Sequence, residues 1–256
     1  MAGGCSGHMN KKVEQFYDET SPDIWKKVIG EDLHYHYGWG EGDIFFNAVK
    51  HLYQFIDERS SVLDCGCGWG GTGKVLKRDL DCNVLGVTNS VVQADYIVDN
   101  NLFDVIHCDL HEYIPNKKFD VCLFLESFCH LSNQSKVLDN IKNTSNKIIL
   151  RDYHLKRQMY PEIDNYLSRW YMNIDTKDNL ISLFDNIGFK LTFFEEHFNH
   201  GAKPTAERWL HNLEKIDKID KKNHLNLLEL SSRFLISTKD LFLEDVGLGT
   251  FVFERQ

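Results

Sequence analysis

A glycine-rich loop in the first third of the chain has the composition of a cofactor-binding loop. The stretch VLDCGCGWGG, residues 62–71, places Asp64 after an apolar run and then glycines at positions 66, 68, 70 and 71. Because glycine has no Cβ, such a backbone can take positive φ and approach a ligand closely. A helix that begins after the loop would offer free N–H groups to an anion. The spacing fits both G-x-G-x-x-G, as in dinucleotide sites, and D-x-G-x-G-x-G, so the loop alone predicts a nucleotide-like cofactor.

Histidines and aromatic residues are concentrated ahead of this loop, in LHYHYGWGEGD at residues 33–43. The segment could be a metal site, a packed aromatic cluster or a lid over a ligand. His34 and His36 are only two residues apart, and no third ligand follows at zinc spacing, so we expect no metal here. We expect Trp39 to pack in a cluster and the segment around Tyr37 to form a lid.

The elements that would position these residues alternate between strands and helices. Short apolar runs occur in SSVLDCG, NVLGVTNS, DVIHCD, FDVCLFLES and NKIILRDY, with helical patterns between them. Nearly continuous apolar runs suit parallel strands covered on both faces. A sixth strand is expected at FKLTFFEEHF, mostly helical sequence over 204–243, and a last strand at GTFVFERQ. This order predicts an α/β fold with a doubly wound sheet.

Composition narrows the classes of function. The chain has 256 residues, 42% of them hydrophobic, which is enough for a substantial core. Acidic residues outnumber basic ones 38 to 29, for a net charge of −9, so nucleic acid is not an expected partner. No apolar run reaches the roughly 18 residues that a membrane span needs. We expect a small-molecule or peptide substrate, no nucleic acid and no membrane span.

Cysteine usage and the start of the chain give two further expectations. The chain has seven cysteines and no C-x-x-C pair, which is typical of reduced thiols and a cytoplasmic location. Residues 1–9, MAGGCSGHM, have the character of an artificial leader. We divide the rest into an N-terminal helical lid segment at 10–57 and a Rossmann-like core at 58–256, with a helical substrate cap at about 200–243.

The second strand indicates a particular family. It ends in GVTNSVVQ, where Gly86, Thr88, Ser90 and Gln93 fit the pattern G-[IVL]-T-x-S-x-x-Q, and no acid stands where a NAD site needs one. Together with D-x-G-x-G-x-G, this pattern resembles class I S-adenosylmethionine-dependent methyltransferases. The branch it resembles acts on small molecules and includes the coclaurine, tocopherol and cyclopropane-synthase types. It could include a peptide-tailoring methyltransferase.

The resemblance implies a seven-stranded Rossmann-like sheet, with an N-terminal helical lid and a helical insert between strands 6 and 7. It also implies S-adenosylmethionine as cofactor, with S-adenosylhomocysteine as its product. Asp109 would lie beside the adenine amino group, and ESFCH at 126–130 resembles the segment after motif IV. The residues that we expect to bind the cofactor are Tyr35, Tyr37, Gly38, Asp64, Gly66, Gly68, Gly70, Thr88, Asn89, Gln93, Asp109, Leu110 and Glu126.

The expected chemistry is methyl transfer to a small natural product or a peptide. The catalytic candidates are His130, His36 and His154, of which the first and last follow strand ends. His34 and Arg208 are the candidates for substrate binding, because arginine offers a fixed charge to an anionic group. By resemblance, the leading prediction is O-methylation of a carboxylate, such as a peptide C-terminus. N- or C-methylation of a small metabolite is the alternative.

Two other classes of function remain open. A NAD-dependent oxidoreductase would use the same glycine loop, but Thr88 at the end of the second strand is evidence against it. A non-catalytic, methyltransferase-like binding module would not need Asp64 and the complete glycine set. Binding of S-adenosylhomocysteine or NAD, and transfer of a labelled methyl group, would separate the three classes.

Overall fold

A computed structural model describes residue 15 and residues 17–157, 161–237 and 244–256. The predicted leader at 1–9 lies outside the described residues. Among the described residues, no helix has both the length and the apolar character that crossing a membrane requires.

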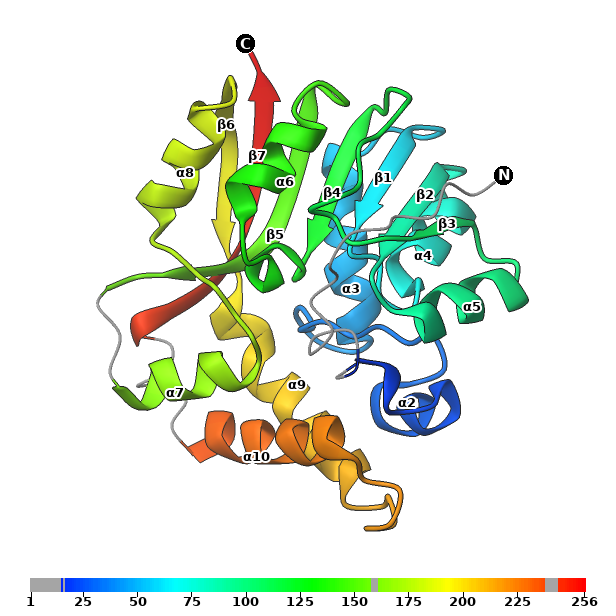
Figure 1. The fold of residues 1–256 in the computed structure, drawn as a ribbon. Coiled ribbons are helices and arrows are strands. Elements are labelled where there is room, and N and C mark those ends of the chain that lie inside the picture. The colour runs from blue at the N-terminus through cyan, green and yellow to red at the C-terminus, as the bar shows by residue number, and fades with distance from the viewer. Residues whose placement is uncertain (1–14, 16, 158–160, 238–243) are drawn as a thin grey trace.

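The core is one mixed sheet of seven strands in the order β3-β2-β1-β4-β5-β7-β6 (Figure 1). β7 is antiparallel to its two neighbours, β5 and β6, and the other pairs are parallel. The predicted α/β fold, a doubly wound seven-stranded sheet, is therefore confirmed. The strands are β1 (Ser61–Cys65), β2 (Asn83–Thr88), β3 (Asp104–His107), β4 (Val121–Leu125), β5 (Lys147–Leu155), β6 (Phe189–Glu196) and β7 (Val246–Arg255).

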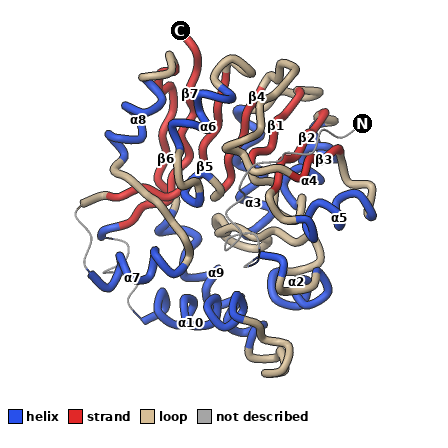
Figure 2. The backbone as a smooth tube through the Cα atoms, viewed as in Figure 1, coloured by secondary structure: helices blue, strands red, loops and turns tan. Residues whose placement is uncertain are grey.

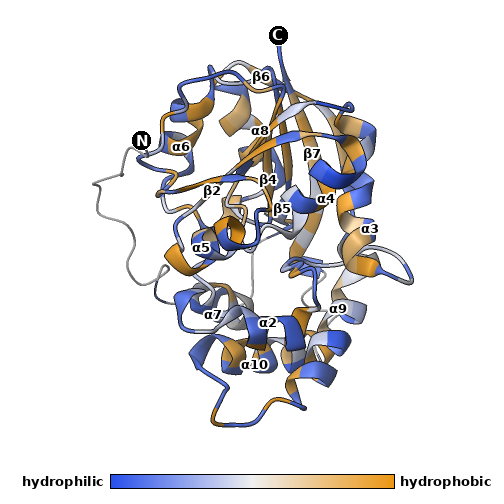
Figure 3. Ribbon diagram, turned by 90° about the vertical axis from the view of Figure 1, so that its right-hand side faces the viewer, coloured by the Kyte–Doolittle hydropathy of each residue, from blue (hydrophilic) through white to orange (hydrophobic). Residues whose placement is uncertain are grey.

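Helices cover both faces of the sheet (Figure 2). On one face, α6 (Gln134–Ile141) and α8 (Lys177–Asp185) pack in a cluster with Phe124 and Phe251 of the strands. On the other, α3 (Ile44–Lys50), the 3-10 helix η1 (His51–Phe55) and α4 (Gly71–Leu80) bury their apolar sides. α5 (Val91–Asp99) joins β2 to β3, and the short 3-10 helix η2 (Phe128–His130) follows β4. Burial on both faces explains why these strands are nearly continuous apolar runs (Figure 3).

Four helices cap the sheet beyond the carboxyl ends of its parallel strands (Figure 1). They are α2 (Pro22–Ile29), α7 (Pro161–Arg169), α9 (Phe198–Leu213) and α10 (Asn223–Ser237). Trp25, Leu167, Trp209 and Leu228, one from each helix, belong to one buried cluster. α9 and α10 form the predicted insert between β6 and β7.

The cap differs from the sequence-based expectation in two respects. α7 was not predicted, because its segment has few apolar residues. Leu167 and the nearby Trp170 anchor it, and the Trp170 indole donates to Ser231 of α10 at 2.7 Å. Helical sequence was expected from residue 204 onward, but α9 already begins at Phe198 and Pro204 lies inside it. Proline removes one helical hydrogen bond, and burial of Ala206 and Trp209 in the next turn offsets that loss.

Five of the described cysteines agree with the expectation of reduced thiols. Cys65, Cys67, Cys82, Cys122 and Cys129 are free thiols and are all buried.

Candidate active site

Two adjoining cavities lie at the carboxyl edge of the sheet. The first is lined by the glycine loop, by the ends of β2, β3 and β4, and by residues 33–36. The second lies under the cap helices and is lined mainly by aromatic side chains. Five residues line both cavities and so mark their junction: Tyr17, Tyr35, His36, Glu126 and His130.

The glycine loop lets backbone pass close to the first cavity. Gly66 has φ +82°, and a Cβ there would lie 2.5 Å from Cβ of Ser127. Its N–H donates to the Val87 carbonyl at 2.8 Å, which ties the loop to β2. Only glycine fits this turn, because a side chain would meet both the unfavourable φ and Ser127. α4 then begins at Gly71, with its N-terminus at the cavity.

Asp64 supplies a buried carboxylate beside this loop. It ends the apolar part of β1, is 1% exposed, and lines the first cavity. Its Oδ2 has no hydrogen-bond partner among the described residues, and burial raises its pKa to about 7. A buried carboxyl oxygen without a protein partner suits a cationic ligand group. S-adenosylmethionine carries an ammonium and a sulfonium, so the residues present fit this cofactor.

Asp64→Asn is expected to weaken binding of S-adenosylhomocysteine about 10- to 100-fold, because it removes a charge-assisted contact of about 1.5–3 kcal/mol. Binding to the unmutated protein should also weaken as the pH falls below about 7, because the carboxyl then holds a proton. Titration calorimetry at pH 6 and pH 8 measures both effects. Equal affinities for the two proteins at pH 8 would contradict this role for Asp64.

The T-x-S-x-x-Q residues build the turn from β2 into α5. The Thr88 hydroxyl donates to Oε1 of Gln93 at 2.8 Å. Ser90 caps α5 by accepting the Gln93 N–H at 3.1 Å. Thr88, Asn89 and Gln93 line the first cavity, whereas Ser90 is fully buried. The motif therefore fixes the shape of this cavity wall through contacts among its own side chains.

Asp109 has a partner that the sequence analysis did not single out. It lines the first cavity with Leu110, as predicted, and His111 lies there too. Oδ1 of Asp109 accepts from Nδ1 of His111 at 2.6 Å, and Nε2 of His111 accepts from the Asn133 N–H at 3.1 Å. These two bonds set the tautomer of His111 and hold Asp109 in place. Asp-x-His at the end of a predicted strand was the available signal for the pair.

Glu126 and Arg151 hold the segment at residues 33–43 in place. Glu126, just after β4 with φ +51°, accepts the Tyr37 N–H at 2.9 Å and forms an ion pair with Arg151 of β5. Arg151 is fully buried and donates through Nη2 to the Tyr37 carbonyl at 2.9 Å. Tyr153 also donates to Glu126, at 3.2 Å. Both backbone groups of Tyr37 are thus bonded to one buried ion pair.

Within residues 33–43, successive side chains point to different places. Tyr35 lines both cavities, and its hydroxyl lies 2.8 Å from Nε2 of His224 in α10. Nδ1 of His36 donates to the Tyr37 carbonyl at 3.1 Å, and its Nε2 lies 3.3 Å from Nδ1 of His34. Trp39 stacks on His51, with ring centroids 4.3 Å apart. The segment therefore lines both cavities and is also part of the packed core.

Most of the predicted cofactor residues line the first cavity. Three do not: Tyr37 lines the second cavity, and Gly38 and Gly70 line neither. The N–H of Gly38 donates to Thr205 of α9 at 2.9 Å. A Cβ at Gly70 would lie 3.0 Å from Ile97, so this glycine is needed for packing of α5. The predicted residues that line the first cavity are Tyr35, Asp64, Gly66, Gly68, Thr88, Asn89, Gln93, Asp109, Leu110 and Glu126.

The structure separates the predicted catalytic and substrate residues. His130 and His36 lie at the junction of the cavities, whereas His34 lines only the first. His154 lines neither and pairs with Glu196 at 3.2 Å. Arg208 is exposed, donates to the Gly42 carbonyl and lies over the Phe45 ring, away from both cavities. His154 and Arg208 therefore have no geometric support in their predicted roles.

Sequence reasoning did not identify most of the second cavity. Its lining comes from segments far apart in the chain, and apart from residues 35–37 and 126–130 none of them belongs to a motif. The aromatic lining residues that the sequence analysis did not single out are Tyr17, Tyr153, Tyr166, Trp170 and Trp209.

Residues 63–146 match a family model described as a methyltransferase domain. The sterol 24-C-methyltransferase of Clavispora lusitaniae is 26% identical over 170 residues, which cover 57% of this chain and 44% of that protein. The chain spans less than half the length of the curated relatives it matches.

Solved structures share the fold. The cyclopropane synthase MmaA2 of Mycobacterium tuberculosis has a TM-score of 0.82 at 15% identity, covering 96% of this chain and 99% of that one. Coclaurine N-methyltransferase bound to N-methylheliamine and S-adenosylhomocysteine has a TM-score of 0.73 at 19% identity, covering 96% and 85%. The predicted resemblance to class I S-adenosylmethionine-dependent methyltransferases of the small-molecule branch is confirmed.

Proposed function

We propose that this protein is an S-adenosylmethionine-dependent methyltransferase that methylates an amine nitrogen of a small, largely apolar molecule. The observation that carries this proposal is the junction of the two cavities. One cavity has the glycine loop and Asp64, the other has aromatic walls, and they meet at His36, Glu126 and His130. This arrangement suits a donor and an acceptor that must meet in line, away from water.

The first cavity suits the cofactor, which when bound supplies a methyl group on a cationic sulfur. Asp64 would hold the cationic end, and the glycine loop would lie along the middle of the molecule. Asp109, fixed by His111, would accept the adenine amino group. Tyr35 and His36 would close the front of the site. The protein's contribution is mainly alignment and exclusion of water.

The second cavity favours an amine over a carboxylate acceptor. Its empty space is about 680 Å³ including the open mouth, which suits a small molecule. The described residues that line it include no arginine or lysine to neutralise a carboxylate. The sequence-based expectation of carboxylate O-methylation, and of a peptide C-terminus, therefore gains no support here. Ring faces of Tyr37, Tyr166 and Trp209 would instead attract a cationic amine.

His130 is placed to take the proton that an ammonium must lose before it can attack. It lies at the junction, with Nε2 3.4 Å from the Tyr17 hydroxyl. Burial lowers its pKa to about 4, so the imidazole is neutral at physiological pH. The neutral imidazole can accept the ammonium proton, and because its pKa is about 4 it does not retain that proton but passes it on to water. Burial also lowers the pKa of His36 well below its usual value.

Labelled methyl transfer tests the proposal directly. The protein is incubated with methyl-labelled S-adenosylmethionine and a panel of aromatic amines, matched carboxylic acids and short peptides. We expect transfer to amines in preference to acids of the same size. Preference for the acids or the peptide C-termini would overturn the choice of acceptor. Binding of NAD without binding of S-adenosylhomocysteine would overturn the cofactor.

The domain division is part of this proposal, and residues 10–14 and 16 of its lid segment lie outside the described residues. We propose residues 10–57 as the lid segment and 58–256 as the core, as the sequence predicted. The substrate cap would consist of the insert at about 200–243 together with α7, because Trp170 and Ser231 both line the second cavity. The cap would then select the acceptor by shape and apolar contact.

A further inference from the structure

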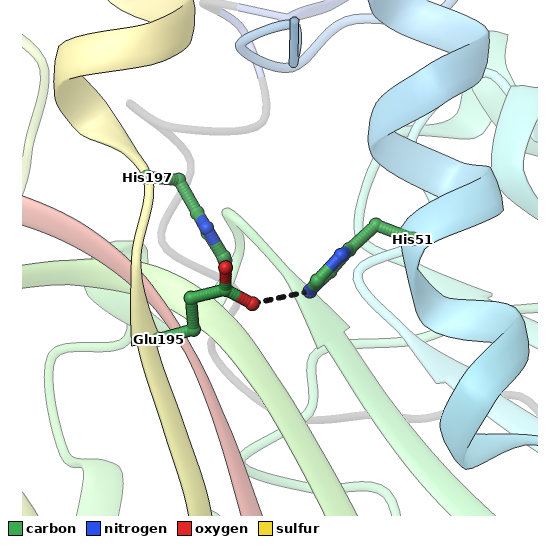
Figure 4. Close-up of side chains that lie close together, drawn as sticks. All are labelled: His51, Glu195 and His197. Carbon is green, nitrogen blue, oxygen red and sulfur yellow. Dashed lines mark ion pairs between the residues drawn. The ribbon is translucent and has the colours of Figure 1, made fainter.

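A second group of histidines lies outside both cavities. His51 begins η1, Glu195 lies near the end of β6, and His197 immediately precedes α9. Their candidate ligand atoms all lie within 4.8 Å of one another, and Nε2 of His51 is 3.5 Å from Oε2 of Glu195. Figure 4 shows the three side chains converging from separate elements. None of them lines either cavity, so the group is not part of the proposed methyl-transfer site.

The donor set is one that divalent transition metals prefer. Two imidazoles and one carboxylate bind zinc in many proteins, with nitrogen and oxygen about 2.0–2.2 Å from the metal. Ligands at that distance lie roughly 3.3 Å apart around a tetrahedral ion, so a modest inward movement would close the site. Glu195 can make that movement because its side chain is 44% exposed. Its exposure also gives an ion a path from solvent.

Neighbouring groups already orient both imidazoles. Nε2 of His197 lies 2.6 Å from the hydroxyl of Thr250 in β7, so a metal would bind its other ring nitrogen. The Gln54 side-chain amide lies 3.3 Å from Nδ1 of His51 and 3.5 Å from its Nε2. Turned so that its oxygen faces the ring, this amide would accept the Nδ1 N–H and leave Nε2, which is toward Glu195, for the metal. Metal-binding histidines in proteins usually have such a partner on the second ring nitrogen. The rings of His51 and His197 are also held by packing against Trp39.

We propose that His51, Glu195 and His197 form a zinc-type metal site that joins η1 to the connection between β6 and α9. An open fourth position would hold water. Trp39 links this site to the lid, because it packs on both imidazoles at centroid distances of 4.3 and 4.0 Å and stands two residues after Tyr37. A bound ion would therefore stiffen the base of the lid without touching the cofactor or the acceptor.

Zinc binding to the chelator-treated full chain tests this site. We expect one Zn²⁺ per chain by calorimetry, and a rise in Tm of about 5 °C at a hundredfold excess over Kd. Tryptophan fluorescence, to which Trp39 contributes as one of five tryptophans, should change with the same midpoint. No saturable binding, or binding without a rise in Tm, would overturn the proposal.

Variants assign the binding to these residues. Glu195→Gln keeps the size of a half-exposed side chain but removes a charged ligand, and His51→Gln removes an imidazole. Each should weaken Zn²⁺ binding at least tenfold. His211→Gln, which changes an exposed histidine of α9 outside the group, is the matched control and should bind like the unmutated protein. Unchanged affinity in Glu195→Gln would overturn the site even if His51→Gln failed to fold.

Discussion

Replacement of His130 by asparagine is expected to lower kcat about 100- to 1000-fold, with less than about a threefold change in the Kd of S-adenosylhomocysteine. The imidazole lies where the two cavities meet, and loss of a positioned general base typically costs this much. Binding should be spared, because the other walls of the first cavity do not change. Single-turnover methyl transfer to an amine acceptor measures the effect on the chemical step. Titration calorimetry with S-adenosylhomocysteine measures the effect on binding.

The pH dependence of kcat gives an independent check of this role. Burial lowers the pKa of His130 to about 4, so the base is already deprotonated well below neutral pH. Protonation of His130 should therefore not limit kcat between pH 5 and pH 8. The contrary result would be a fall in kcat at acid pH that is controlled by a group with a pKa near 6.5 and is absent in His130→Asn. His130 would then have an ordinary pKa, and the argument from its burial would be wrong.

His154→Asn is the informative comparison for His130→Asn. Sequence reasoning gave the two histidines the same role, because each follows a strand end on the ligand-binding edge of the sheet. In the structure His154 lies against Phe194, Phe251 and Glu196, with no access to either cavity. We expect kcat to change little in the folded His154 variant. Equal losses in both variants would indicate a general effect on packing.

Most of the lining of the first cavity could be predicted from the sequence because its information is local. The glycine loop, the T-x-S-x-x-Q turn and Asp109 each follow one strand within a few residues, and parallel strands bring their carboxyl ends to one edge. The contacts that bind such a cofactor therefore come from short motifs in a regular sheet. The fold followed from the same alternation of apolar strands and helices.

The acceptor end could not be predicted because its contacts are long-range. Tyr35 meets His224, and Trp170 meets Ser231, across 189 and 61 residues of sequence. Arg151 is a clearer case. Its strand is an apolar run in the sequence, and one charged residue within that run does not indicate which residue would pair with it. Its partner Glu126 was predicted to bind the cofactor. In the structure Glu126 does line that cavity, but its carboxylate oxygens are occupied by Arg151, Tyr37 and Tyr153.

Arg151→Met is expected to destabilise the protein by about 3–5 kcal/mol, because it leaves Glu126 buried without its countercharge. Methionine preserves most of the volume of the arginine side chain, so the loss in the free energy of unfolding reflects mainly the removal of the positive charge. Burial already raises the pKa of Glu126 to about 7, and removal of Arg151 should raise it further. In the unfolded chain this carboxyl has its usual lower pKa. The destabilisation should thus be larger at pH 8, where folding buries a charge, than at pH 6, where Glu126 can stay protonated.

The double variant Glu126→Gln/Arg151→Met separates the ion pair from its surroundings. Removing both charges should recover part of the lost free energy of unfolding, as is common for buried pairs, whereas either single change leaves one charge alone. Recovery should still be incomplete, because Arg151 also donates to the Tyr37 carbonyl and Glu126 accepts the Tyr37 N–H. Urea unfolding of the four proteins at pH 6 and pH 8 measures the coupling. If Arg151→Met were as stable as the unmutated protein at pH 8, Glu126 could not be held as a buried carboxylate, and the lid would need another anchor.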